Sequence, residues 1–167
     1  DMTMDILLAR VDSRLLHGQV ATAWAKKVKP NRILVVSDSV AEDNLRKTLI
    51  TQAAPPGILV NVITVEKMIR IYQDSQFDSF KVLLLTETLQ DMLKLVDGGI
   101  DVSDLGIDVG SLAYAVDMTM LTDAIAVGKE EIATIRTLHE RGLTVYAQKI
   151  PNDSRKDLIK MLDKNNL

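Results

Sequence analysis

One segment of the sequence gathers side chains that could carry out phosphate chemistry. Residues 10–20 are Arg-Val-Asp-Ser-Arg-Leu-Leu-His-Gly-Gln-Val. Arg10 and Arg14 could neutralise the oxygens of a transferring phosphoryl group. His17 carries an imidazole, and a neutral imidazole can attack phosphorus without a separate base. The segment therefore predicts a phosphoryl-transfer site with His17 as the nucleophile and Arg14 as the group that stabilises charge.

The other polar residues of this segment have weaker claims. Asp12 could position an arginine or the loop backbone, or could serve only as a turn residue. Ser13 could donate a hydrogen bond to phosphate or could only favour the turn. Gly18 leaves room beside the imidazole. Gln19 could donate its side-chain amide to phosphate or could simply be exposed in the first turn of a helix. We assign Arg10, Asp12, Ser13, Gly18 and Gln19 as candidate binding residues.

The reactive residues also have structural interpretations. His17 could cap the following helix instead of reacting. Arg10 and Arg14 could form salt bridges to Asp12 or remain as solvated charges. The second histidine, His139, lies near the end of a predicted helix, where it would complement the helix dipole. No other ligand-type residue lies at metal-binding spacing from His17, and no glycine-rich nucleotide motif occurs, so we expect neither a metal nor a cofactor.

Composition limits the class of protein. The 167 residues are 47% hydrophobic, carry a formal net charge of −3 and include no cysteine. This size suits one domain with a substantial core. The charge gives no reason to expect nucleic acid as a partner. No apolar run approaches the roughly 18 residues that span a membrane, so we expect no transmembrane segment and a cytoplasmic protein.

Apolar strand-like runs alternate with helix-like runs along the chain. The helix expected over 40–54 carries Leu45, Leu49 and Ile50 on one face. The segment from Leu105 to Val127 is less regular and predicts short strands. Strands are expected over 4–9, 32–36, 58–63, 80–85, 106–109, 118–121, 124–127 and 143–148, and helices over 20–27, 40–54, 64–72, 89–96, 129–141 and 155–162.

This alternation predicts one α/β domain over residues 1–167, with a doubly wound, open, mainly parallel sheet and helices on both faces. Residues 10–20 would then form the turn between the first strand and the first helix. Such turns lie at the carboxyl edge of the sheet, where ligands bind. The amino end of the helix would direct N–H groups and a positive dipole end at the loop, which favours a phosphate.

The segment also resembles a known signature. Residues 10–20 are similar to Arg-Ile-Asp-Asp-Arg-Leu-Ile-His-Gly-Gln-Val, the pattern of the IIB components of the mannose/fructose/sorbose family of the bacterial phosphotransferase system. The resemblance covers essentially the whole chain and leans towards the sorbose or fructose branch. Further matching segments, in the expected order, are 32–38, 45–49, 53–57, 65–67, 95–99 and 140–142.

The resemblance implies a protein-histidine–sugar phosphotransferase. His17 would accept a phosphoryl group, on the ring nitrogen nearer the main chain, from a phosphohistidine of a separate IIA protein. The group would then pass to a sugar carried by the membrane components IIC and IID, which the protein would join peripherally. The family serves mannose, fructose, sorbose and amino sugars, and the sequence does not name one. A different class, a non-catalytic module that binds sugar phosphates or phosphoproteins, stays open.

Two departures from the family pattern change polar residues. Ser13 replaces the usual second aspartate, which removes one negative charge from the loop. At 107–112 the family usually has Asn-Val-Gly-Gly-Met, so Asp108 puts a carboxylate in place of an amide and Ser111 replaces a glycine. We expect the IIA partner to contact the turn at 37–39 and the segment 108–112, which would lie at the same edge as His17.

Overall fold

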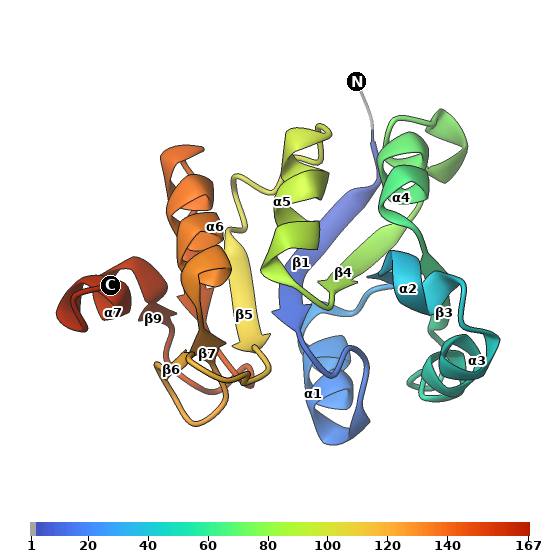
Figure 1. Cartoon of the computed structure of the whole chain (residues 1–167). Coiled ribbons are helices and arrows are strands. Elements are labelled where there is room, and N and C mark those ends of the chain that lie inside the picture. Colours follow the sequence, from blue (N-terminus) through green and yellow to red (C-terminus); the bar gives the residue numbers. More distant parts are fainter. Residues whose placement is uncertain (1–2) are drawn as a thin grey trace.

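A seven-stranded, mostly parallel sheet forms the centre of the molecule. The computed structural model describes residues 3–167, so residues 1 and 2 of the predicted domain lie outside it. The sheet has the order β3-β2-β4-β1-β5-β8-β9, and β9 alone runs antiparallel to its neighbour (Figure 1). Its strands are β1 (Asp5–Asp12), β2 (Arg32–Val36), β3 (Leu59–Ile63), β4 (Lys81–Thr86), β5 (Ile107–Ser111), β8 (Val145–Ala147) and β9 (Lys156–Asp157).

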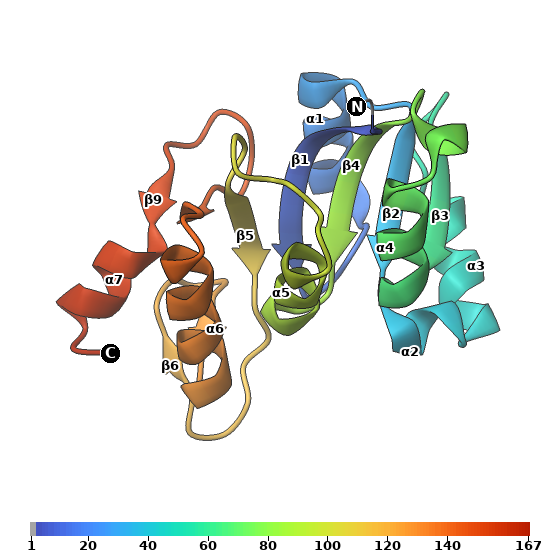
Figure 2. The same cartoon turned by 90° about the horizontal axis from the view of Figure 1, so that it is seen from above.

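Helices cover both faces of the sheet. Figure 2 shows α1 and α3 on one side of the strands and α4, α5 and α6 on the other. A short antiparallel pair, β6 (Thr119–Met120) and β7 (Ala126–Val127), follows β5. The helices are α1 (Gly18–Val28), α2 (Asp38–Ala41), α3 (Asn44–Gln52), α4 (Val65–Tyr72), α5 (Leu89–Asp97), α6 (Lys129–Glu140) and α7 (Leu158–Lys164), with a 3₁₀ turn at Ser75–Phe77. The predicted doubly wound α/β fold is confirmed.

The sheet separates two hydrophobic clusters. One side packs α1 and α2 onto the strands and contains Leu15, Leu16 and Trp24. The larger cluster on the other side receives the buried faces of α4, α5, α6 and α7. β1 lies between β4 and β5 and is paired with both, so its end is held from two sides. This pairing fixes the point at which the chain leaves β1 and enters the loop at residues 13–17.

The helix predicted over 40–54 is wrong as a single element. The chain breaks into α2 and α3 because Asp43 has an extended backbone and its carboxylate accepts from the Arg46 N–H (3.2 Å), which starts a new helix. Of the predicted apolar face, Ile50 packs against the cluster that contains Trp24, whereas Leu45 is 71% and Leu49 58% exposed. Only part of the face predicted from the 3.6-residue spacing therefore meets the core.

The remaining elements differ from the predictions mainly at their ends. Strand β1 continues to Asp12, three residues beyond the predicted end, because β4 and β5 pair with it there. The helix expected from Arg155 begins at Leu158, because residues 156–157 pair with β8 as β9. In the described residues, no helix is long and apolar enough to cross a membrane.

Candidate active site in the loop after β1

The loop at residues 13–17 connects the carboxyl end of β1 to α1 (Figure 1). Its backbone turns sharply at Leu15, where φ is +57°, a left-handed conformation that costs a non-glycine residue about 1 kcal/mol or more. The Leu15 N–H donates to the carbonyl of Asp12 (2.9 Å). Leu15 and Leu16 are both buried in the cluster beneath α1. Burial of these two side chains offsets the backbone cost and anchors the loop.

His17 occupies the N-cap position of α1. Within residues 3–167, its side chain makes no capping hydrogen bond, so the interpretation of His17 as a side-chain cap is wrong. The ring is half-buried, and its Nδ1 lies 3.5 Å from the Leu15 carbonyl oxygen, at the outer limit of a hydrogen bond. The imidazole therefore lies at the amino end of the helix without capping it.

The first turn of α1 explains the glycine after His17. Gly18 has φ of +43°, a value that favours glycine. Apart from its two chain neighbours, a Cβ atom there would meet no heavy atom within 4 Å in the described residues, so the backbone turn is the reason for the glycine that the structure supports. Gln19 is exposed, and the turn contains no acidic side chain. The amino end of α1 thus keeps its positive character next to His17.

Asp12 is the hydrogen-bonding centre of the loop. Its side chain is 1% exposed, and Oδ1 accepts from the Arg14 N–H (2.9 Å) and from the Ser111 hydroxyl (2.7 Å). The Nε of Arg14 lies 3.7 Å from the same oxygen, while half of the Arg14 side chain remains exposed. Of the two interpretations left open by the sequence, the contacts favour Asp12 as the residue that positions Arg14 and the loop backbone.

Arg10 points into the protein. Its guanidinium is 3% exposed and forms ion pairs with Asp108 and with Asp12 (3.4 Å to Oδ2). The same group donates to the carbonyls of Gln148 (2.8 Å) and Lys149 (3.2 Å). The structure therefore places Arg10 in a buried network that joins β1, β5 and the segment after β8, beneath the loop that carries His17.

Two further residues pack against the Arg10 guanidinium. Trp24 of α1 has its ring centre 5.5 Å from Cζ of Arg10, and its indole Nε1 donates to the Lys149 carbonyl (3.0 Å). Gly110 lies so close that a Cβ atom would collide with the guanidinium. The Arg10 guanidinium is thus surrounded by the Trp24 ring, by Gly110 and by four hydrogen-bond acceptors. These contacts fix its position.

Asp108 is also inside the protein. It is fully buried, accepts from Arg10 and from the Gln148 N–H (2.9 Å), and belongs to the central part of β5. Burial raises the pKa of Asp108 to about 6, against the lowering effect of Arg10 and of the Gln148 N–H. The expectation that the segment 108–112 forms a docking surface is wrong, because all five residues are buried.

Ser13 is directed towards β5. Its Oγ lies 2.8 Å from Oγ of Ser111, and its N–H lies within hydrogen-bond distance of both the carbonyl and the hydroxyl of Ser111. The sequence reasoning identified Ser111 only as a departure from a pattern. It missed the contact because the two serines are 98 residues apart.

Two of the larger cavities in the described residues border the loop. One, of about 640 Å³, lies between α1 and the end of α3; Gly18 and Gln19 line it at one end, and Pro55 and Pro56 line its opposite wall. The other, of about 260 Å³, is lined by Ser13 and by the residues that start α5 and follow β5. Both are reached from the loop that carries His17.

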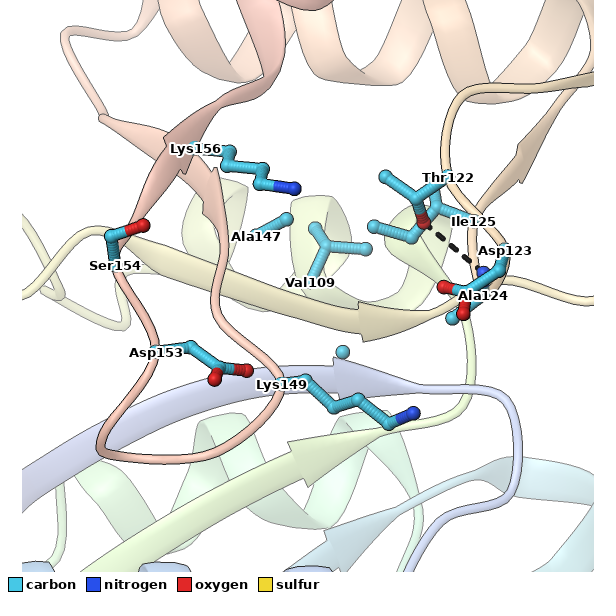
Figure 3. A pocket seen from close by; sticks show the side chains of 11 residues that line it. Val109, Thr122, Asp123, Ala124, Ile125, Ala147, Lys149, Asp153, Ser154 and Lys156 are labelled. Atoms are coloured by element: carbon cyan, nitrogen blue, oxygen red, sulfur yellow. Dashed lines mark hydrogen bonds between the residues drawn. The ribbon is translucent and has the colours of Figure 1, made fainter.

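A third cavity, of about 340 Å³, lies on the far side of β5 from β1. Figure 3 shows Lys156 extending from β9 across this cavity towards Thr122 and Ile125. Neither His17 nor Arg14 lines it, and Lys149 and Gly110 connect it to the Arg10 network. In residues 3–167, the structure brings together no group of three side chains that could hold a metal ion.

Comparison with known families accounts for this arrangement. Residues 6–167 match the model of a family described as the PTS system sorbose subfamily IIB component. The chain belongs to this family. The resemblance recognised from the loop signature is therefore confirmed, and it extends over the whole described fold.

Related sequences and solved structures support the same family assignment. The chain is 41% identical to the mannose-specific EIIAB component of Escherichia coli K12 over 164 residues, which cover 96% of the chain and 50% of that protein. It is 37% identical to the sorbose-specific EIIB component of Lacticaseibacillus casei, with 96% of each covered. The IIBSor domain of the sorbose permease from Klebsiella pneumoniae superposes with a TM-score of 0.92 at 32% identity, covering 96% of this chain and 98% of that one. The chain thus spans about half the length of the EIIAB relatives.

Asp108 should contribute a measurable pH dependence to stability. In the folded protein its pKa is about 6, against the usual 3.8, so between these values the folded protein binds a proton that the unfolded chain releases. This contribution to stability is present below pH 3.8 and is lost as the pH rises through about 6. Urea denaturation of the wild type and of Asp108→Asn at several pH values should show that the wild type loses stability relative to the variant from pH 4 to pH 7. A difference that stays constant or changes in the opposite direction contradicts the assignment.

Proposed function

We propose that this protein is a phosphocarrier of a sugar phosphotransferase system, with His17 as the covalent intermediate. His17 accepts a phosphoryl group from a phosphohistidine of a IIA protein and passes it to a sugar carried by the membrane components IIC and IID. The observation that carries the proposal is the imidazole at the amino end of α1 that does not cap the helix, in the same short loop as a half-exposed arginine, in a chain of the IIB family.

The surroundings of His17 suit a phosphoryl group. The amino end of α1 offers N–H groups and a positive dipole end, and its first turn adds no negative charge. Asp12 holds the Arg14 backbone, so the guanidinium can turn its outer N–H groups towards the phosphoryl oxygens. Charge on those oxygens would thus be balanced by a cation and by the helix.

The transfer itself exchanges one nitrogen–phosphorus bond for another. The lone pair of a neutral His17 ring nitrogen attacks phosphorus, the bond to the donor histidine breaks, and the electron pair returns to the donor ring. The family resemblance points to Nδ1 as the attacking atom. The Leu15 carbonyl oxygen can only accept, so its 3.5 Å contact with Nδ1 needs a hydrogen on that nitrogen. Before the attack, the ring must turn away from that oxygen and carry its one hydrogen on Nε2, which leaves the lone pair on Nδ1.

The docking surface for IIA surrounds this loop. At the turn of 37–39, Asp38 and Ser39 are exposed while Ser37 is buried as the cap of α2. After β5, the exposed surface begins beyond Leu112 and includes Tyr114 and Val116, which are 62% and 83% exposed. A partner that must leave after every transfer needs a modest interface, and a few aromatic or apolar side chains suffice as its centre.

The rival function is a module that binds phosphorylated ligands reversibly at the same loop. Such a module would use the helix end and Arg14 without forming a bond to His17. The carrier is favoured because the side chain of His17 is not engaged as a helix cap and its one printed contact, from Nδ1 to the Leu15 carbonyl oxygen, is long at 3.5 Å.

Loss of His17 should abolish phosphorylation. Incubation of the wild type with phosphorylated IIA should add one phosphoryl group, visible by mass spectrometry as an acid-labile, base-stable modification. His17→Ala should remain unmodified, whereas the control His139→Ala should be modified like the wild type. A wild type that binds phospho-IIA but keeps its original mass would support the binding module, and modification of His17→Ala would show that another residue is the acceptor.

Arg14 should give a graded effect on rate. Arg14→Lys keeps a cation but loses the planar two-point contact, so single-turnover transfer from phospho-IIA should slow. Arg14→Ala should be slower by roughly 10²-fold, as for the loss of one preorganised donor. Arg141→Ala is the matched control, because Arg141 is similarly exposed and similarly paired, with Asp97. An unchanged rate in Arg14→Ala would mean that its charge is only solvated.

Tyr114 should contribute to donor docking. Tyr114→Ser should raise the half-saturating concentration of phospho-IIA several-fold with little change in the maximal transfer rate, because the side chain is exposed and does not belong to the loop that carries His17. Leu59→Ser is the control, since Leu59 is equally exposed but begins β3 at the opposite edge of the sheet. Equal effects of the two substitutions would place the docking surface elsewhere.

A further inference from the structure

The buried hydroxyl of Ser111 lies where strand β5 meets the loop that carries His17. Ser111 is the last residue of β5 and is 5% exposed. Its Oγ lies 2.7 Å from Oδ1 of Asp12 and 2.8 Å from Oγ of Ser13, and it also accepts from the Ser13 N–H (3.2 Å). One side-chain atom of β5 therefore bonds to two consecutive residues at the start of the loop.

The single hydrogen of this hydroxyl sets the direction of the network. The Asp12 oxygen accepts, so Ser111 donates its hydrogen to Asp12. The Ser13 hydroxyl must then donate to Ser111, since Ser111 has no second hydrogen to offer. The hydrogen of Ser13 is consequently committed inside the protein and is not offered to a phosphate.

The Ser111 hydroxyl is linked to the Arg14 backbone through the Asp12 carboxylate. Oδ1 of Asp12, which receives the Ser111 hydrogen, also accepts from the Arg14 N–H (2.9 Å). The Ser111 hydroxyl thus sets the position of the carboxylate that orients Arg14, three residues before His17. Ser13 and Ser111 are two of the positions at which the sequence departs from the family pattern, and here they contact each other directly.

We propose that Ser111 is a positioning residue for phosphoryl transfer, and that its hydroxyl acts by holding Asp12 and Ser13 so that the Arg14–His17 turn keeps its reactive geometry. Ser13 serves this network as a donor to Ser111 in place of a phosphate contact. The proposal rests on the proposed phosphocarrier function. It assigns no contact between Ser111 and the phosphoryl group.

The test compares Ser111→Ala with the wild type in single-turnover transfer from phospho-IIA. Removal of the hydroxyl should lower the maximal rate about 10-fold or more, because a small displacement of a reactive group is enough to slow transfer strongly. The half-saturating concentration of phospho-IIA should stay unchanged, since Ser111 is buried. Thr134→Val is the matched control, because it also removes one buried hydroxyl, from α6, away from the loop.

A second measurement separates positioning from a general loss of stability. Amide hydrogen exchange of Ser13 and Arg14 should accelerate in Ser111→Ala while the central strands exchange as in the wild type. A normal rate in Ser111→Ala, or faster exchange throughout the sheet, would overturn the proposal. Failure of the wild type to take up any phosphoryl group would instead refute the phosphocarrier function, while the exchange data would still show whether Ser111 holds the loop.

Discussion

The structure depends on one buried cation placed between two carboxylates. Arg10 pairs with Asp12 of its own strand and with Asp108 of the neighbouring strand, and all three are almost completely excluded from solvent. Charges buried in this way are costly unless every polar atom is bonded, and removal of one partner leaves the others unpaired. The carbonyls of Gln148 and Lys149 accept from the remaining N–H groups of Nη1 and Nη2. A chain with this cluster has few alternative packings at the centre of its sheet.

The geometry of the loop at residues 13–17 depends on that cluster. Asp12 has one oxygen facing Arg10 and the other facing the loop, so the same carboxylate belongs to the core and to the site. Burial of Leu15 and Leu16 anchors the loop, while Arg14 and His17 stay accessible. Residues that fix the loop and residues that we propose to take part in the transfer thus alternate within the eight positions from Arg10 to His17.

The sequence predicted the parts that local pattern determines. The β-branched run at 32–36 was predicted with its observed ends, because a fully buried strand has a plain signature. The position of His17 between a strand and a helix followed from the same reasoning. The break at Asp43 was missed because apolar spacing outweighed a capping residue. The burial of Arg10 and Asp108, and the Ser13–Ser111 contact, depend on strands that only the tertiary structure brings together, so no local signal could reveal them.

The contacts that join Arg10 to Lys149 and Ser13 to Ser111 have a consequence for how the protein matures. They link residues 139 and 98 positions apart, so the loop cannot take its reactive shape until β5 and the segment after β8 have docked beside β1. Contacts of such long sequence separation form late, because the intervening chain must be ordered first. A nascent or partly folded chain would already expose the histidine but lack the arrangement around it. For the phosphocarrier proposed above, an incompletely folded chain would therefore be a poor acceptor of a phosphoryl group.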